Sequence, residues 1–261
     1  MRETPLPGQQ GGENEAAVGR LYRELLYPDL DTRVMGYDPL RLADAVFWLA
    51  HGDGGRPLLS RQTLELALAA GLLAELALAR KIYLRAGATS ELPGLVGICY
   101  QAPPAAVAEY EYAREAPVDD VSKYVYDQIY LDPDRDLQDW LMVLRTVSLA
   151  KVRDRLNLPS SPKVSRLRPS ALPRAPTGRR ADEPWAALTM RLRRQQVLSI
   201  ADAVLVGLCL AVGLRRHLLE GTLEPARIHV EQAVAALPDD LAQIVAQTDA
   251  AVAHGAVKPR P

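Results

Sequence analysis

The chain has 261 residues, and its 48% hydrophobic and 24% charged residues are the balance of a globular protein that buries a sizeable core. Its formal net charge is -1, which excludes a general attraction for nucleic acid or anionic lipid, so such affinity must come from local clusters of charge. The two cysteines, Cys99 and Cys209, lie far apart in apolar runs, which indicates core thiols in a reducing compartment and excludes a disulfide framework.

The N-terminal segment is polar. Residues 1–15 are rich in Gly, Pro, Gln and Glu, so we expect a disordered tail without the apolar stretch of a secretory signal. A short helix is expected over 16–26, where Tyr27-Pro28 ends it.

The next two segments are apolar and helical. Residues 40–50 predict one helix, closed by the glycine-rich turn at 52–55. Residues 62–80 predict the strongest helix, which is apolar on nearly every face and therefore belongs at the centre of the structure. Glu75 lies inside it, and a buried carboxylate requires a partner. We expect Glu75 to be an internal cap or to pair with an arginine, in preference to a catalytic role.

The middle of the chain alternates between strand and helix signals. Residues 81–84 and 95–100 are short β-branched or aromatic runs separated by glycine and proline, which predicts a small hairpin. Helical spacing returns over 118–129 and 136–156, with Asp136 as the expected N-cap of the second helix.

The composition changes abruptly after this helix. Residues 157–184 predict a basic, proline-rich loop within the domain. It contains Pro159, Pro162, Pro169, Pro173, Pro176 and Pro184, with Lys163, Arg166, Arg168, Arg174, Arg179 and Arg180. Helix is expected again over 185–219, 224–236 and 239–253, before a short tail at 256–261.

One apolar stretch, residues 197–214, could be mistaken for a membrane span. It carries Asp202 near its middle, and its uninterrupted part is shorter than the roughly 20 residues that a span needs. We therefore expect a buried core helix.

Catalytic and metal signatures are absent from the sequence. The turn at 52–55 lacks the residues of a phosphate-binding loop, and the four histidines have no metal-ligand spacing. Asp132, Asp134 and Asp136 alternate as in a calcium loop, but Leu137 and Val143 occupy the positions that need Gly and Glu. We expect no enzyme activity, no cofactor and no metal.

A cluster of basic residues is the remaining functional signal. Arg145, Lys151, Arg153 and Arg155 lead into the proline-rich segment, with Lys151 and Arg155 on one helical face and Arg153 displaced from it. Three interpretations stay open: a solvated surface, a site for anionic lipid headgroups, or a nucleic-acid site. Residues 157–183 lack aromatic side chains for base stacking, so nucleic acid is not expected.

Four segments resemble the Golgi phosphoprotein 3 family. They are residues 43–59 (ADAVFWLAHGDGGRPLL), 72–84 (LLAELALARKIYL), 137–144 (LQDWLMVL) and 152–156 (VRDRL). With similarly arranged C-terminal helices, the resemblance covers roughly residues 40–255 and places a single domain at 16–255. The rarity of lysine beside arginine and the abundance of alanine favour a bacterial member.

The resemblance implies a mainly α single domain, with a helical core wrapped by amphipathic helices and minor β-hairpin content. It also implies recognition of phosphatidylinositol 4-phosphate at a membrane and recruitment of protein partners. The family's pocket uses a tryptophan, an arginine in the core helix and an R-x-x-R pair. In this chain three of these positions depart from the pattern, as Ser60, Ala69 and Ala150, and only Arg153 is kept.

The resemblance therefore implies a headgroup site built from Arg153 with the nearby cations Lys151, Arg61 and Arg145. We expect a cytoplasmic protein, peripheral to the inner face of the membrane, that binds anionic lipid and an unidentified protein partner. The alternative is a soluble protein–protein adaptor with the same fold and no lipid binding. The family's hairpin falls within residues 157–184, which lack its apolar alternation, so self-association stays open.

Overall fold

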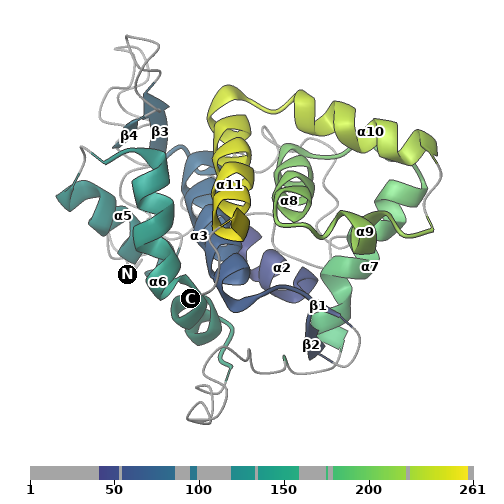
Figure 1. Cartoon of the computed structure of the whole chain (residues 1–261), viewed down its shortest axis with the longest axis horizontal. Coiled ribbons are helices and arrows are strands. Elements are labelled where there is room, and N and C mark those ends of the chain that lie inside the picture. Colours follow the sequence, from purple (N-terminus) through teal and green to yellow (C-terminus); the bar gives the residue numbers. More distant parts are fainter. Residues whose placement is uncertain are drawn as a thin grey trace, which may run out of the picture. The chain divides into compact units, whose positions relative to one another are not determined.

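A computed structural model describes residues 41–52, 55–85, 95–98, 119–132, 135–158, 175, 179–221 and 224–257. The predicted N-terminal tail, the helix at 16–26 and most of the proline-rich loop lie outside these residues. The described elements form a mainly α domain (Figure 1). Its helices are α2 (Leu42–Leu49), α3 (Arg61–Leu78), α5 (Asp120–Leu131), α6 (Leu137–Arg155), α7 (Arg179–Arg193), α8 (Ile200–Ala211), α9 (Arg215–Leu219), α10 (Glu224–Ala235) and α11 (Asp239–Val257).

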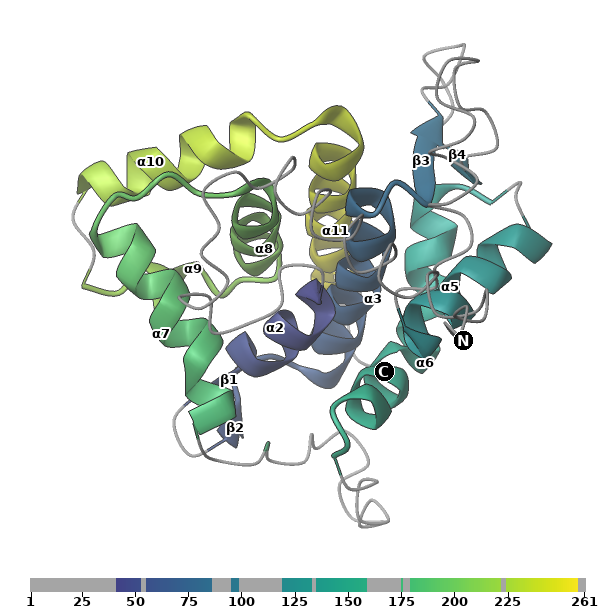
Figure 2. The same ribbon diagram turned by 180° about the vertical axis from the view of Figure 1, so that it is seen from behind.

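Helix α3 is the central element, as the sequence predicts. It begins at Ser60, whose hydroxyl accepts a hydrogen bond from the backbone N–H of Thr63 at 3.1 Å. From Leu66 to Leu76 every residue of the helix is buried, because α2, α5, α6, α8 and α11 all pack against it (Figure 1, Figure 2). The continuous apolar pattern is thus matched by neighbours on all sides.

Helix α2 confirms the prediction for residues 40–50 and packs closely on α3. The close approach occurs at Gly71, where an added Cβ would lie 2.9 Å from the Cα of Ala43. Glycine therefore lets the two backbones meet at this crossing.

Helices α5 and α6 lie on one side of α3. Asp136 caps α6 as predicted, and its carboxylate accepts from the N–H of Asp139 at 2.7 Å. The Ser148 hydroxyl of α6 donates to the Glu65 carbonyl of α3 at 2.7 Å, which fixes α6 beside the first turns of α3. Asp119 caps α5 by accepting from two backbone N–H groups.

Two short antiparallel hairpins complete the described elements. Strands β3 (Ile82–Arg85) and β4 (Leu95–Ile98) pair with Ile82 opposite Ile98, which confirms the predicted hairpin. Strands β1 (His51–Gly52) and β2 (Arg56–Pro57) pair on either side of the glycine-rich turn.

The prediction of a single helix over 185–219 is wrong, because three helices, α7, α8 and α9, occupy this region. Helix α7 ends at Arg193, and Gln195 after it is left-handed with φ 52°, a conformation that glycine usually signals in a sequence. Ser199 and Asp202 then form a capping box that starts α8, and Gly213 with φ 86° follows its end.

The start of α7 also corrects the predicted loop at 157–184. The helix begins at Arg179 and contains Pro184, which lacks the N–H for one intrahelical hydrogen bond. Leu188 and Leu192 are fully buried, and this burial outweighs the lost bond.

The core of the apolar stretch at 197–214 forms the buried helix α8, as predicted, whereas Val197 lies before the helix and is 90% exposed. Cys209 is a free buried thiol, and burial raises its pKa to about 12. No helix in the described part of the chain is long and apolar enough to cross a bilayer. Helices α10 and α11 follow at the predicted places, although α11 extends to Val257, inside the predicted tail.

Candidate functional site

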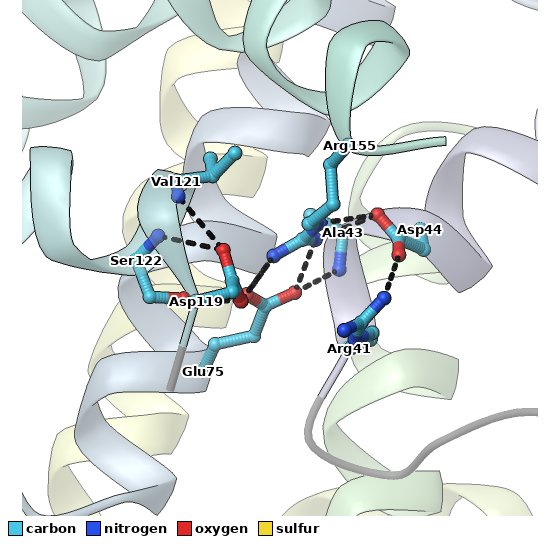
Figure 3. A network of polar contacts seen from close by, with 8 residues as sticks. All are labelled: Arg41, Ala43, Asp44, Glu75, Asp119, Val121, Ser122 and Arg155. Atoms are coloured by element: carbon cyan, nitrogen blue, oxygen red, sulfur yellow. Dashed lines mark hydrogen bonds and ion pairs between the residues drawn. The ribbon is translucent and has the colours of Figure 1, made fainter. Parts of the chain in front are cut away.

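Arg155, near the end of α6, lies at the centre of a buried cluster of charged groups (Figure 3). Only 4% of its side chain is exposed. Its guanidinium contacts three carboxylates from three parts of the chain: Asp44 of α2 at 2.7 Å, Glu75 of α3 at 2.9 Å and Asp119, the cap of α5, at 3.2 Å. The cluster thus joins α2, α3, α5 and α6.

Glu75 makes the most complete set of contacts. Two guanidinium nitrogens of Arg155, Nη1 and Nη2, each donate to one of its oxygens at 2.9 Å. The backbone N–H of Ala43 donates to Oε1 at 2.8 Å, which satisfies a group at the start of α2. The prediction that Glu75 is an internal cap or an arginine partner is confirmed on both counts.

The pKa values of the carboxylates in the cluster reflect burial, which disfavours the charged form, and the contacts with Arg155, which favour it. Burial raises the pKa of Glu75 to about 7, although Arg155 opposes the shift. Burial likewise raises the pKa of Asp44. The pKa of Asp119 is lowered in spite of its burial, because backbone N–H groups and Arg155 stabilise the carboxylate. Burial alone disfavours the charged guanidinium, but the three carboxylates raise the pKa of Arg155 above its ordinary value.

The sequence does not reveal Asp44 and Asp119 as members of this cluster. Asp44 had a usable signal, since it interrupts the apolar run of α2 in the same way that Glu75 interrupts α3. Asp119 falls inside the helix predicted over 118–129, whereas in the structure it caps that helix. No group of three or more His, Cys, Asp or Glu residues in the described ranges could hold a metal ion.

The four residues of the predicted headgroup site stand in different surroundings. Arg61 is the first residue of α3; its side chain is 41% exposed and its Nε lies 2.7 Å from Oε1 of Glu65. Arg145 is a half-exposed residue of α6, one turn before Ser148, which contacts the Glu65 carbonyl. The first turns of α3 therefore bring Arg61 and Arg145 to the same end of the α3–α6 pair.

Lys151 and Arg153 lie on opposite flanks of α6. The Nζ of Lys151 lies over the Tyr124 ring of α5, 4.0 Å from its centroid. Arg153 is buried at 8% exposure, and residues two apart on a helix project about 200° from each other. Burial and, after it, the charge of Arg153 lower the pKa of His51 in β1. The structure therefore does not bring these two cations into one pocket.

The three positions that depart from the family pattern also differ from one another in location and exposure. Ser60 caps α3 and is exposed, Ala69 is fully buried within α3, and Ala150 is exposed on α6. A methyl side chain at each alanine supplies no hydrogen bond to a ligand.

The comparisons with known proteins agree with this architecture. No curated protein and no solved structure matches the chain significantly. The family model described as Golgi phosphoprotein 3 (GPP34) matches residues 42–254, from the start of α2 almost to the end of α11. The chain therefore belongs to the Golgi phosphoprotein 3 (GPP34) family.

Proposed function

We propose that this protein is a peripheral membrane-binding protein, without enzyme activity, that docks on anionic lipid headgroups at the cytoplasmic face of a membrane. The observation that carries the proposal is the position of the basic side chains beside the N-terminus of α3. Arg61 lies in its first turn, and the contact between Ser148 and Glu65 holds the Arg145 turn of α6 next to it.

The N-terminus of α3 adds to this positive surface. The aligned peptide dipoles of a helix place partial positive charge there, and the first turn of α3 contains no acidic residue. Arg61 keeps much of its side chain exposed, although Glu65 offsets part of its charge. We name Arg61 and Arg145, with the N-terminus of α3, the α3–α6 basic surface.

The binding mode is electrostatic capture with limited selectivity. Each cation near an anionic membrane contributes about 1 kcal/mol. Salt at 0.1 M screens this attraction once the charges are more than about 10 Å apart. Lys151, over the Tyr124 ring, adds to the positive potential of α6, whereas Arg153 is buried. We expect only a slight preference for phosphoinositide headgroups, which disappears when the surface charge of the vesicles is matched.

Vesicle co-sedimentation tests this proposal. Wild-type protein is expected to sediment with vesicles that contain phosphatidylinositol 4-phosphate at low salt and to stay in solution with neutral vesicles. The double variant Arg61→Gln with Arg145→Gln is expected to lose most of this binding. The matched control is Arg194→Gln with Arg216→Gln, which removes two exposed cations from the end of α7 and from α9. Equal loss in both variants would contradict a localised surface.

The second candidate function is a soluble protein–protein adaptor. Ser60, Ala69 and Ala150 favour it, because they replace the aromatic and two guanidinium groups that the family uses for the headgroup. Wild-type protein that binds no vesicles even at low salt would support this candidate and exclude the first.

A further inference from the structure

The Arg155 cluster contains a feature that a structural ion pair does not need. Glu75 Oε2 and Asp119 Oδ2 both accept from the same nitrogen, Nη1 of Arg155, at 2.9 and 3.2 Å. The Ser122 hydroxyl lies between the same two oxygens, 3.5 Å from Glu75 and 3.1 Å from Asp119. Two carboxylates, one from α3 and one from the cap of α5, thus share a single nitrogen of the Arg155 guanidinium.

The charged groups around Glu75 do not balance. Asp44 and Asp119 face it with negative charge, and Arg155 supplies the nearest positive charge. Arg41 is more distant, because its Nη1 lies 4.0 Å from the far oxygen of Asp44. Lys151, one turn before Arg155 on α6, lies over the Tyr124 ring. Among the residues that the structure describes, three ionised carboxylates therefore exceed the positive charge that reaches the buried centre.

We propose that the Arg155 cluster is a proton-dependent lock between α3 and α5: α5 is held on α3 while the cluster carries one proton, and opens more readily when that proton is lost. A proton on Glu75 removes the repulsion between Glu75 and Asp119 and leaves Arg155 paired with two carboxylates. When the proton leaves, the repulsion acts across the contact between α3 and α5.

Helix α5 is the element that this repulsion would displace. Within α5 only Val121, Ser122, Val125 and Ile129 are buried, whereas most of α3 is enclosed. Asp119 also caps α5, so movement of its carboxylate removes hydrogen bonds to the N–H groups of Val121 and Ser122 at 2.8 and 3.0 Å. Opening is therefore expected to begin at the N-terminus of α5.

The direction of the pH dependence follows from Glu75. Its pKa in the fold is about 7, above the ordinary 4.5 that it regains on opening, so the closed form binds the proton more tightly. The stabilising effect of the proton is complete below the ordinary pKa and is lost as pH rises through about 7. Asp119, with its lowered pKa, stays ionised across this range, so the change of charge falls on Glu75.

Hydrogen exchange of the intact chain tests the lock. The exchange rates are first corrected for the intrinsic effect of pH. The equilibrium constant for opening of α5 is then expected to increase about tenfold between about pH 6 and pH 8, because one proton is bound with a pKa of about 7 in the closed form and 4.5 in the open form. Exchange of α8 is the internal control, because its buried pair of Asp202 and Arg191 lies outside the cluster. Unchanged protection of α5 would overturn the proposal.

The variant Glu75→Gln isolates the proton. It keeps an oxygen for the Ala43 N–H and removes one of the three negative charges, so α5 is expected to exchange equally at both pH values. The same tenfold change in this variant would overturn the proposal. Should it fail to fold, the carboxyl NMR titration of glutamate-labelled wild type decides: a Glu75 midpoint near neutrality supports the lock, and a midpoint in its ordinary range refutes it.

Discussion

Arg155 shows how the function of a basic residue depends on its depth. In the sequence it is one of four closely spaced cations, and nothing in their order distinguishes it from Lys151 or Arg153. In the fold its guanidinium is enclosed by carboxylates of α2, α3 and the α5 cap, so it stabilises the core and adds nothing to an exposed basic surface. The apolar context of Glu75 predicts an arginine partner but does not identify which one, because the contact spans 80 positions.

Replacing Arg155 tests its structural role. Arg155→Met leaves Glu75 and its neighbours buried without a countercharge, and is expected to lower the free energy of unfolding by about 3–5 kcal/mol in urea titrations. Arg155→Lys keeps a charge but loses the two-nitrogen contact, so an intermediate loss is expected.

The control for this series is Arg193→Met, at the exposed end of α7, which is expected to change stability by less than about 0.5 kcal/mol. If Arg155→Met also lowered the free energy of unfolding by less than about 0.5 kcal/mol, the cluster would not contribute to the stability of the fold.

At the scale of the elements, periodicity predicts where helices form better than where they break. The central position of α3 follows from its apolar character on every face, and α5 and α6 follow from helical spacing behind Asp119 and Asp136. The break between α7 and α8 was missed because Gln195 adopts the left-handed conformation without glycine. The capping box at Ser199 and Asp202 was the available signal, hidden inside an apolar run.

The crossing of α2 and α3 gives a test of packing. Gly71→Ala places a methyl group 2.9 Å from the Ala43 Cα, where backbone must move, and is expected to cost about 1–3 kcal/mol in thermal or urea unfolding. Gly255→Ala in α11 is the matched change, since no atom lies within 4 Å of its added methyl group. It is expected to be neutral or to stabilise by up to about 1 kcal/mol. Equal effects would show that α2 and α3 are not in close contact.

For the whole molecule, the order of segments along the chain identifies the family, and the family accounts for the helical architecture over residues 42–254. Local residues determine the ligand, and the resemblance implies that Ser60, Ala69 and Ala150 depart from the family pattern. The sequence also predicts Lys151 and Arg153 in one site, whereas residues two apart on a helix project about 200° from each other. Lys151 lies over the Tyr124 ring of α5, and Arg153 is buried. The α3–α6 basic surface remains as the proposed contact with the membrane.

The most direct test of this account compares wild-type binding to two kinds of vesicle with matched surface charge, one with phosphatidylinositol 4-phosphate and one with phosphatidylserine, across salt concentration. Electrostatic capture by a few cations predicts similar, weak binding to both, falling steeply between about 50 and 200 mM salt. Tight, salt-insensitive binding to the phosphoinositide vesicles alone would contradict it, because that result requires an enclosed headgroup pocket. Binding to neither vesicle at low salt would contradict membrane docking itself.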